Sequence, residues 1–420
     1  MSGGDESSVY RGESRQQRRR RERERERAEA IERVNRVPLA DVVRENALVH
    51  LPPAAATRLR LVHPSWGRRV SSPLFAVAHA AAPRRISGVF VPEAGFLPFD
   101  GDDTVPSPSL SFVPASSELV VLSSSRGVAC CFSPVDDAYA VCNPATASWT
   151  AVPTPPHRSW PRPAIVVIFD TSAYNFRGDF TLVCPFEPAP ESSVYCFQVF
   201  TSGTGTWWVT DAMTPAEGLV AASGVAAGGT AWWRTSIGTA VGYNPVTRRV
   251  ELVTCPGDSG QWEIGSAAGR LHCTVVDGDD VVVFRLQEHG IWEEATRVGV
   301  AEILRPPQPE PARLTITSAE LVSSQHLSRA VAAAPEDGVQ LLGFQGAEVE
   351  VVVLAGRRLV AFDTGTRRRR EVAVPDDVDA AWNGAEYAAH TNTLALVAPA
   401  ILAAEPPLAE PPADEEATSS

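Results

Sequence analysis

Short apolar runs separated by turn residues fill the chain from residue 83 to about residue 402. The runs are rich in Val, Phe, Trp and Tyr, and Gly, Pro, Asp or Asn stand between them. The first group of residues favours β-strands and the second favours turns. Clear runs occupy residues 119–122, 165–169, 194–200, 281–286 and 351–354. We therefore expect an all-β domain over residues 83–402.

One strand–turn–strand pattern returns inside this domain. It is clearest at residues 141–153, 242–253 and 361–372, where an Asn or Asp begins a turn and a Thr follows three positions later. Asn and Asp side chains accept hydrogen bonds from the backbone two residues ahead, which favours a tight bend. Each copy therefore predicts a hairpin.

The spacing of the copies indicates the architecture. The positions that we take as equivalent, counting two weaker copies, are Asn143, Gln198, Asn244, Arg285 and Asp363. They lie 55, 46, 41 and 78 residues apart, and we interpret the last interval as about two repeats. A repeat of about 40–50 residues is typical of a four-stranded propeller blade. We predict a β-propeller-like domain of about six blades.

Residues 37–80 have a helical pattern instead. Pro38 precedes a helix that Pro52 and Pro53 end, residues 54–62 are strong helix formers, and Pro64 starts a third helix. Apolar residues at helical spacing, Leu59, Val62, Trp66 and Val70, form one seam. Three helices in about 40 residues are too small to be stable alone, so we expect this block to pack against something else. The predicted fold is mainly β with a small N-terminal α-helical block.

Both ends of the chain are polar. Residues 1–36 consist of a polar start, residues 1–10, and a highly charged run, residues 11–36, whose alternating Arg and Glu predict a solvated helix or a disordered arm. Arg18–Arg21 fit a nuclear-localisation signal, although charge runs of this kind are more often simply solvated. Residues 403–420 are acidic, Pro-rich and without aromatic residues, so we expect disorder.

Charge and cysteine content narrow the class of protein. The net charge is −13, with +6 on residues 1–80 and −19 on the rest, which argues against a nucleic acid as partner of the β domain. Seven cysteines in apolar runs, without metal-binding spacing, predict buried reduced thiols. No run is long enough for a membrane span. We expect a protein of the nucleus, the cytoplasm or both.

All 37 basic residues are arginine, and lysine is absent from the sequence. A GC-biased coding sequence explains this without any functional cause. The alternative is that the chain works beside a ubiquitin-transfer centre and lacks the side-chain amines on which it would be modified. Composition does not separate the two.

Catalytic and metal-binding patterns are missing from the sequence. There is no Gly-x-x-x-x-Gly-Lys loop and no Gly-x-Ser-x-Gly elbow. The acidic pairs after Gly101 and Gly278 are typical of hairpin bends, and Arg367–Arg370 is predicted to be solvated. We therefore assign no catalytic, cofactor or metal site.

Residues 51–75 resemble the second and third helices of the F-box family without a gap. The shared marks are Leu51-Pro52, residues 58–62 (Arg-Leu-Arg-Leu-Val), Trp66 and residues 71–75 (Ser-Ser-Pro-Leu-Phe). Ala40, Asn46 and His63 depart from the family's pattern. Independently, residues 124–130 and 141–146 resemble the kelch-like F-box-associated β-domain found in many plant proteins, as do residues 199–207.

This resemblance implies a non-catalytic substrate-recognition subunit of a Skp–cullin–F-box ubiquitin ligase. The helical block, residues 37–80, would bind a Skp-type adaptor and through it a cullin scaffold, and the β domain would bind a protein target. The residues that the resemblance implies for adaptor binding are Leu39, Val42, Leu48, Leu51, Pro52, Leu59, Leu61, Val62, Trp66 and Val70.

Two alternatives stay open. The same apolar residues would also be explained if they only pack against the β domain. The whole chain would also fit an intracellular propeller that binds a sugar or another ligand and has no link to ubiquitin, which would require converging polar or metal-binding residues at the end of the blades.

Overall fold

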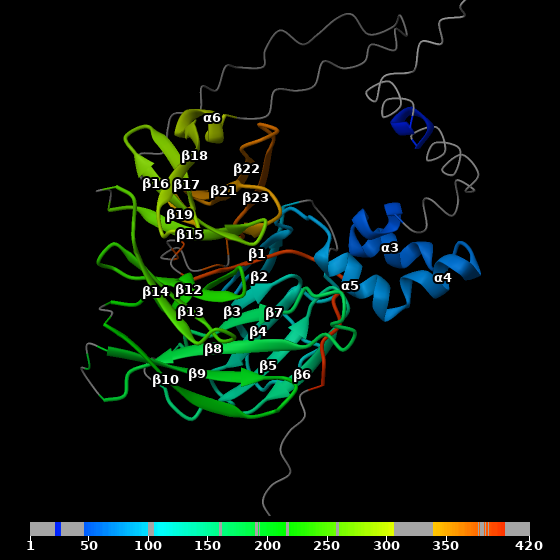
Figure 1. The fold of residues 1–420 in the computed structure, drawn as a ribbon, viewed down its shortest axis with the longest axis horizontal. Coiled ribbons are helices and arrows are strands. Elements are labelled where there is room, and N and C mark those ends of the chain that lie inside the picture. The colour runs from blue at the N-terminus through cyan, green and yellow to red at the C-terminus, as the bar shows by residue number, and fades with distance from the viewer. Residues whose placement is uncertain are drawn as a thin grey trace, which may run out of the picture. The chain divides into compact units, whose positions relative to one another are not determined.

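A computed structural model describes residues 22–26, 46–99, 105–158, 162–189, 192, 194–215, 218–257, 260–305, 339–376, 378, 382, 384 and 386–399 (Figure 1). The chain divides into two compact units, Met1–Leu51 and Pro52–Ser420. In the first unit, residues 22–26 are helical and exposed, and η2 (Leu48–His50) is a 3₁₀ turn. The boundary between the units falls inside the predicted helical module, residues 37–80, and the tail at 403–420 lies outside the described residues.

Three short helices open the second unit: α3 (Pro53–Leu59), α4 (Pro64–Val70) and α5 (Pro73–Ala81). Each has a proline in its first turn, where the missing N–H has no helical partner to lose. His63 is extended before Pro64, with φ −155° and ψ 142°, as predicted. We did not predict α5, although Ser72 marks its start by accepting a hydrogen bond from the N–H of Phe75 at 3.2 Å.

The strands form six sheets within the described residues, which we number as blades in chain order (Figure 1). Blade 1 contains β1 (Gly88–Val91), β2 (Gly95–Pro98) and β24 (Ala388–His390). Blade 2 contains β3 (Val120–Ser125), β4 (Val128–Ser133), β5 (Ala138–Asn143) and β6 (Ser148–Val152). Blade 3 contains β7 (Val166–Phe169), β8 (Phe180–Phe186), β9 (Val194–Thr201) and β10 (Trp207–Pro215).

The other three blades follow the same antiparallel order. Blade 4 contains β11 (Val225–Ala227), β12 (Thr230–Arg234), β13 (Thr239–Asn244) and β14 (Arg249–Thr254). Blade 5 contains β15 (Trp262–Ala267), β16 (Arg270–Asp277), β17 (Asp280–Leu286) and β18 (Trp292–Gly299). Blade 6 contains β19 (Gln340–Leu342), β21 (Glu350–Ala355), β22 (Arg358–Asp363) and β23 (Arg369–Ala373). Between blades lie η3 (Ala221–Ser223), α6 (Val300–Leu304) and β20 (Gln345–Gly346), which pairs in parallel with β15.

The blades close into a ring because the two ends of the domain share one sheet. β24 pairs antiparallel with β1 and contacts β3 of the next blade. The innermost strands then follow one another around the centre, with contacts from β3 to β7, from β7 to β11, from β11 to β15 and from β15 to β19. The protein is therefore mainly β, a six-bladed propeller with short N-terminal helices, as predicted.

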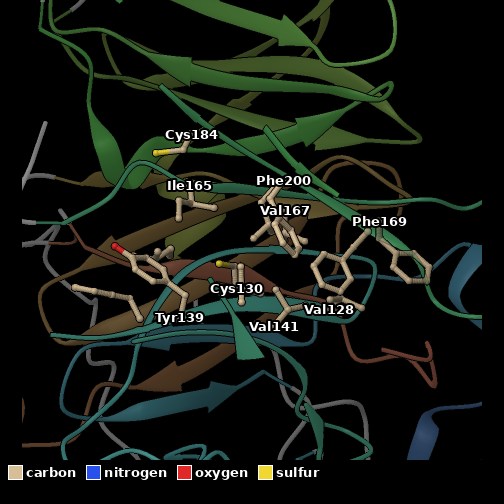
Figure 2. Close-up of a cluster of buried hydrophobic side chains, with 14 of the residues drawn as sticks. Val128, Cys130, Tyr139, Val141, Ile165, Val167, Phe169, Cys184 and Phe200 are labelled. Carbon is tan, nitrogen blue, oxygen red and sulfur yellow. The ribbon is translucent and has the colours of Figure 1, made fainter. Parts of the chain in front are cut away.

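Each pair of adjacent blades encloses its own hydrophobic core. The core between blades 2 and 3 joins side chains of β4 and β5 to side chains of β7, β8 and β9, with Cys130, Val141, Val167 and Phe200 at its centre (Figure 2). Equivalent cores lie between every other neighbouring pair, including blades 6 and 1. Alternate residues of one strand thus face opposite neighbours, which explains why the runs are apolar throughout.

The predicted burial of the cysteines is confirmed for six of the seven, and Cys255 is half-buried. Cys130 faces blade 3 and Cys131 faces blade 1, so the adjacent pair serves two different cores. Burial raises the pKa of the Cys130 thiol well above its ordinary value, which keeps this side chain a neutral, apolar packing group.

The five positions taken as equivalent do repeat from blade to blade, but the interpretation of the 78-residue interval as two repeats is wrong. Asn143, Gln198, Asn244, Arg285 and Asp363 all lie on the third strand of consecutive blades, from blade 2 to blade 6. The 78 residues from Arg285 to Asp363 therefore hold one repeat and not two, lengthened by residues 306–338, which fall between α6 and β19. The sixth blade is blade 1, which is built from both ends of the domain and lacks the turn pattern.

Candidate functional site

The turn between α3 and α4 carries two exposed aliphatic side chains. Leu61 is 91% exposed and Val62 is 64% exposed. Backbone hydrogen bonds of 3.2 Å hold both residues, from Leu61 N to Arg58 O and from Val62 N to Leu59 O. Leu59 at the end of α3 and Trp66 in α4 are half-buried beside them in sequence. We call Leu59, Leu61, Val62 and Trp66 the α3–α4 surface.

The ten residues named from the sequence occupy different environments. Leu39 and Val42 lie outside the described residues. Leu48 in the first unit and Val70 in the second are buried. Leu51 is half-buried, and Pro52 is exposed at the start of α3. The members of the predicted seam therefore differ: Val70 is buried, Leu59 and Trp66 are half-buried, and Val62 is exposed, as is its neighbour Leu61. Sequence spacing alone did not distinguish these environments.

Helix α5 ties the helical segment to the propeller. Phe75 is fully buried, and Ala80 belongs to the core between blades 2 and 3. The Nδ1 atom of the buried His79 accepts a hydrogen bond from the N–H of Leu394 at 3.1 Å. The rings of Phe75 and His79 pack with their centroids 5.7 Å apart. α5 is therefore part of the folded domain, and α3 and α4 extend from a fixed base.

The helical segment is strongly basic. Residues 52–85 contain six arginines and no Asp or Glu. Arg58, Arg60 and Arg68 are exposed on α3, on the turn that follows it and on α4. The α3–α4 surface is therefore an apolar group of side chains surrounded by positive charge. Such a surface fits a partner with an acidic rim around an apolar recess.

The acidic groups of the β domain were the other candidates for a functional site. No group of three or more His, Cys, Asp or Glu side chains in the described part of the chain is arranged to hold a metal ion. The acidic turn at Gly278 is a hairpin bend between β16 and β17, as predicted. Gly101 lies outside the described residues.

The interpretation of Arg367–Arg370 as a solvated run is wrong for its second half. Arg370 is half-buried and forms an ion pair of 2.6 Å with the buried Glu350. Arg369 is also covered and donates a hydrogen bond of 2.6 Å to the carbonyl of Leu304. Arg367 does reach solvent, and it pairs with Glu302 at 3.2 Å. The run therefore joins blade 6 to α6, and Arg370 also pairs within the blade.

A search of the described helices for a membrane span found none of sufficient length and apolarity.

These features define the class of protein: a six-bladed β-propeller that begins with short basic helices bearing an exposed apolar turn. No family model matches the chain, and no curated protein matches it.

Among solved structures, apo AztD from Citrobacter koseri aligns with 68% of this chain and 78% of its own, at 10% identity and a TM-score of 0.32. A structure of YCF48 bound to D1 peptide covers 64% of this chain and 70% of its own, at 13% identity and a TM-score of 0.33. A structure of BBS1N in complex with ARL6DN covers 64% of this chain and 69% of its own, at 11% identity and a TM-score of 0.30. These likenesses are too distant to support an argument, and the fold assignment rests on the sheet topology.

Proposed function

We propose that this protein is the substrate-recognition subunit of a Skp–cullin–F-box ubiquitin ligase. In this proposal the α3–α4 surface binds a Skp-type adaptor and through it a cullin scaffold, and the propeller binds a protein target through its loops. The chain contributes recognition and no catalytic group. It would act in the nucleus, the cytoplasm or both.

The observation that carries the proposal is the exposure of Leu61 and Val62. Both belong to the Arg-Leu-Arg-Leu-Val segment that resembles the F-box family, and both face solvent. Large aliphatic side chains in contact with water are a common mark of a binding surface when they gather beside an aromatic residue, here the half-buried Trp66.

Magnitudes show that these two residues are not sufficient alone. Burying a Leu or Val side chain fully contributes about 1.5–3 kcal/mol, so the pair contributes roughly 3–6 kcal/mol before the entropy lost on association. That corresponds at best to weak binding, since about −8 kcal/mol is needed for a micromolar complex. We therefore expect Leu59, Trp66 and the surrounding arginines to take part. Leu39 and Val42, which the resemblance also implies, lie outside the described residues.

The decisive experiment changes the exposed pair. We expect Leu61→Asp combined with Val62→Asp to reduce co-purification with a Skp-type adaptor by at least about tenfold, because two charges would have to be buried in an apolar recess. The folding of the variant should be unchanged, since both side chains already face water. Circular dichroism and thermal unfolding check this.

Val246→Asp is the matched control, because Val246 is 88% exposed in the turn between β13 and β14, far along the chain from the helices. It should leave adaptor binding unchanged. If the intact protein binds no Skp-type adaptor, or if the double variant binds as well as the control, the proposal is wrong. Changing Leu59 or Trp66 is less informative, because both are half-buried and their loss also affects folding.

A further inference from the structure

A cavity lies where the innermost strands of the propeller end. Its volume is about 210 Å³. The walls come from the ends of β3, β7, β11 and β15, from the Gln345–Gly346 pair, and from the segments that follow β24 and α5. The cavity therefore sits at one mouth of the central channel, and residues far apart in sequence meet there.

Three tight hairpins border this mouth, and each of them contains at least one glycine. The register pairs Ser125 with Val128, Ala227 with Thr230 and Ala267 with Arg270, so each of these turns has only two residues. Both residues of each turn have positive φ, which is the type I′ geometry that favours glycine. A Cβ on Gly269 would meet no atom within 4 Å, so space remains there.

Two arginines line the cavity, and Nε of one of them, Arg84, donates a hydrogen bond of 3.2 Å to the carbonyl of His79. The other is Arg126, and none of the lining residues is Asp or Glu. The Arg126 guanidinium makes no hydrogen bond or ion pair within the described part of the chain. Burial lowers the pKa of Arg126, and it lowers the pKa of Arg84 to about 10.

Other partly covered arginines of the propeller are neutralised. Arg234 pairs with Glu263 at 3.0 Å, and Arg370 pairs with Glu350 at 2.6 Å. A partly buried cation is unfavourable unless an anion accompanies it. Arg126 thus differs from these two because its anion is not supplied by the described residues.

Neutral donors complete the lining. Thr171, Ser266 and Gln345 contribute hydroxyl and amide groups to the same walls. Arginine together with hydroxyl and amide donors is the usual environment of a bound phosphate group, because guanidinium binds two phosphate oxygens at once.

We propose that this channel mouth binds a phosphate or diphosphate group carried by a small molecule, with Arg126 as its principal ligand and Arg84 as a second cation of the same lining. The volume is below the roughly 300–1,000 Å³ of sites for drug-sized ligands, so the cavity suits the charged group and a few further atoms. This site is independent of adaptor binding by the α3–α4 surface.

The test titrates the full chain with pyrophosphate and with inorganic phosphate by isothermal titration calorimetry. We expect saturable binding of pyrophosphate and weaker binding of phosphate. Arg126→Asn should weaken pyrophosphate binding at least about tenfold, since it removes a charged hydrogen-bonding group. Asn suits the first position of a type I′ turn, so the φ of +52° at this residue is tolerated.

Arg248→Asn is the matched control, because Arg248 also has a positive φ, of +55°, and is exposed away from the cavity lining. It changes the net charge equally and should leave binding within about twofold of the unmodified protein, well inside 1 kcal/mol. Thr171→Asp is a second variant, at an exposed lining residue, and its carboxylate should compete with the ligand for Arg126.

The source of the phosphate group is distinguished with phosphatidylcholine vesicles that contain or lack phosphatidic acid. Retention on the acidic vesicles that Arg126→Asn abolishes assigns the site to a lipid headgroup, and binding of pyrophosphate alone assigns it to a soluble ligand. The proposal is overturned if neither probe binds the unmodified chain, or if the Arg126 and Arg248 variants bind equally.

Discussion

Asn or Asp begins three equivalent turns of the propeller, and the three side chains form the same local hydrogen bond in different surroundings. Asn143, Asn244 and Asp363 each accept a hydrogen bond from the backbone N–H two residues ahead, at 2.9, 3.0 and 3.0 Å. This is the bend predicted from the sequence, and it is confirmed. The partners of their remaining polar atoms differ, because each blade has different neighbours. Asp363 alone carries a charge, and it pairs with Arg85 at 2.8 Å.

Asp363 should make the stability of the protein depend on pH. Burial by itself raises the pKa of this carboxyl, but the N–H groups of Thr366 and Gly365 and the charge of Arg85 outweigh burial, so the pKa lies below its usual value. A lowered pKa in the folded state stabilises the fold above the unfolded pKa of about 3.9, and this stabilisation is lost as the pH falls through the folded value.

We therefore expect Asp363→Asn to lower the free energy of unfolding by about 1 kcal/mol at neutral pH. The difference from the unmodified protein should shrink as the pH falls from about 4 through the lowered folded pKa of Asp363, because both side chains are neutral only below that pKa. Urea unfolding at several pH values measures this. Arg85→Gln is the control and should flatten the same pH dependence; a difference that stays constant with pH would contradict the assignment.

At the scale of the element, hairpins and short helices follow local signals. The two-residue turns after β3 and β15 both end in glycine, Gly127 and Gly269, with φ of +91° and +75°. Helix α5 begins with Ser72 and Pro73, a start signal that we overlooked. The residues that pack against each element can be distant in the sequence. A Cβ on Gly127 would lie 2.2 Å from Oγ1 of Thr393, which comes from the other end of the domain.

Alanine at the two glycines should separate backbone strain from steric overlap. Gly269→Ala should cost about 1–2 kcal/mol of unfolding free energy, because positive φ is unfavourable for an L residue. Gly127→Ala should cost a further 1–3 kcal/mol or so, because the new methyl group overlaps the packed Thr393. Chemical denaturation of both variants gives the comparison, and equal losses would show that Thr393 moves aside freely.

At the scale of the whole molecule, hydrogen bonds between side chains and the backbone stabilise the closure of the ring where the two ends of the domain meet. Glu350 accepts a hydrogen bond from the N–H of Ile86 at 2.9 Å, which joins blade 6 to the entry of blade 1. Asn143 donates from Nδ2 to the carbonyls of Thr393 and Ala395, at 3.1 and 2.7 Å. These hydrogen bonds act together with the pairing of β24 with β1 to close the ring.

Asn143 should therefore matter for closure more than its counterpart in blade 4. Asn143→Ala leaves two buried carbonyls without their donor, and we expect it to lower the free energy of unfolding by roughly 2–4 kcal/mol. Asn244→Ala loses turn hydrogen bonds and a 3.2 Å bond from its Nδ2 to Thr230, which should cost about 1 kcal/mol. Urea denaturation compares the two, and a larger loss for Asn244→Ala would refute this account of closure.

The candidate site was only partly predictable. The sequence located Leu61 and Val62 within a segment that resembles a known family. Helical spacing, however, placed Val70 on one seam with Val62, whereas Val70 is buried and Val62 is exposed. The channel-mouth cavity had no sequence signal except its turn glycines. Arg126 and Arg84 meet there because the ring brings the start of the domain beside the inner strands.

The amino-acid sequence by itself determined the strands, the Asn and Asp turns, the proline-started helices α3 and α4, and the repeat that predicts a propeller. These depend on a few neighbouring residues: on turn chemistry, on backbone restriction and on strands buried on both faces. Only the tertiary structure decided that blade 1 combines β1 and β2 with β24, that Arg370 pairs with the buried Glu350, and that no acid lines the cavity beside Arg126. Such pairings join residues that are far apart in the chain, and they follow from the geometry of a closed ring, which no local pattern encodes.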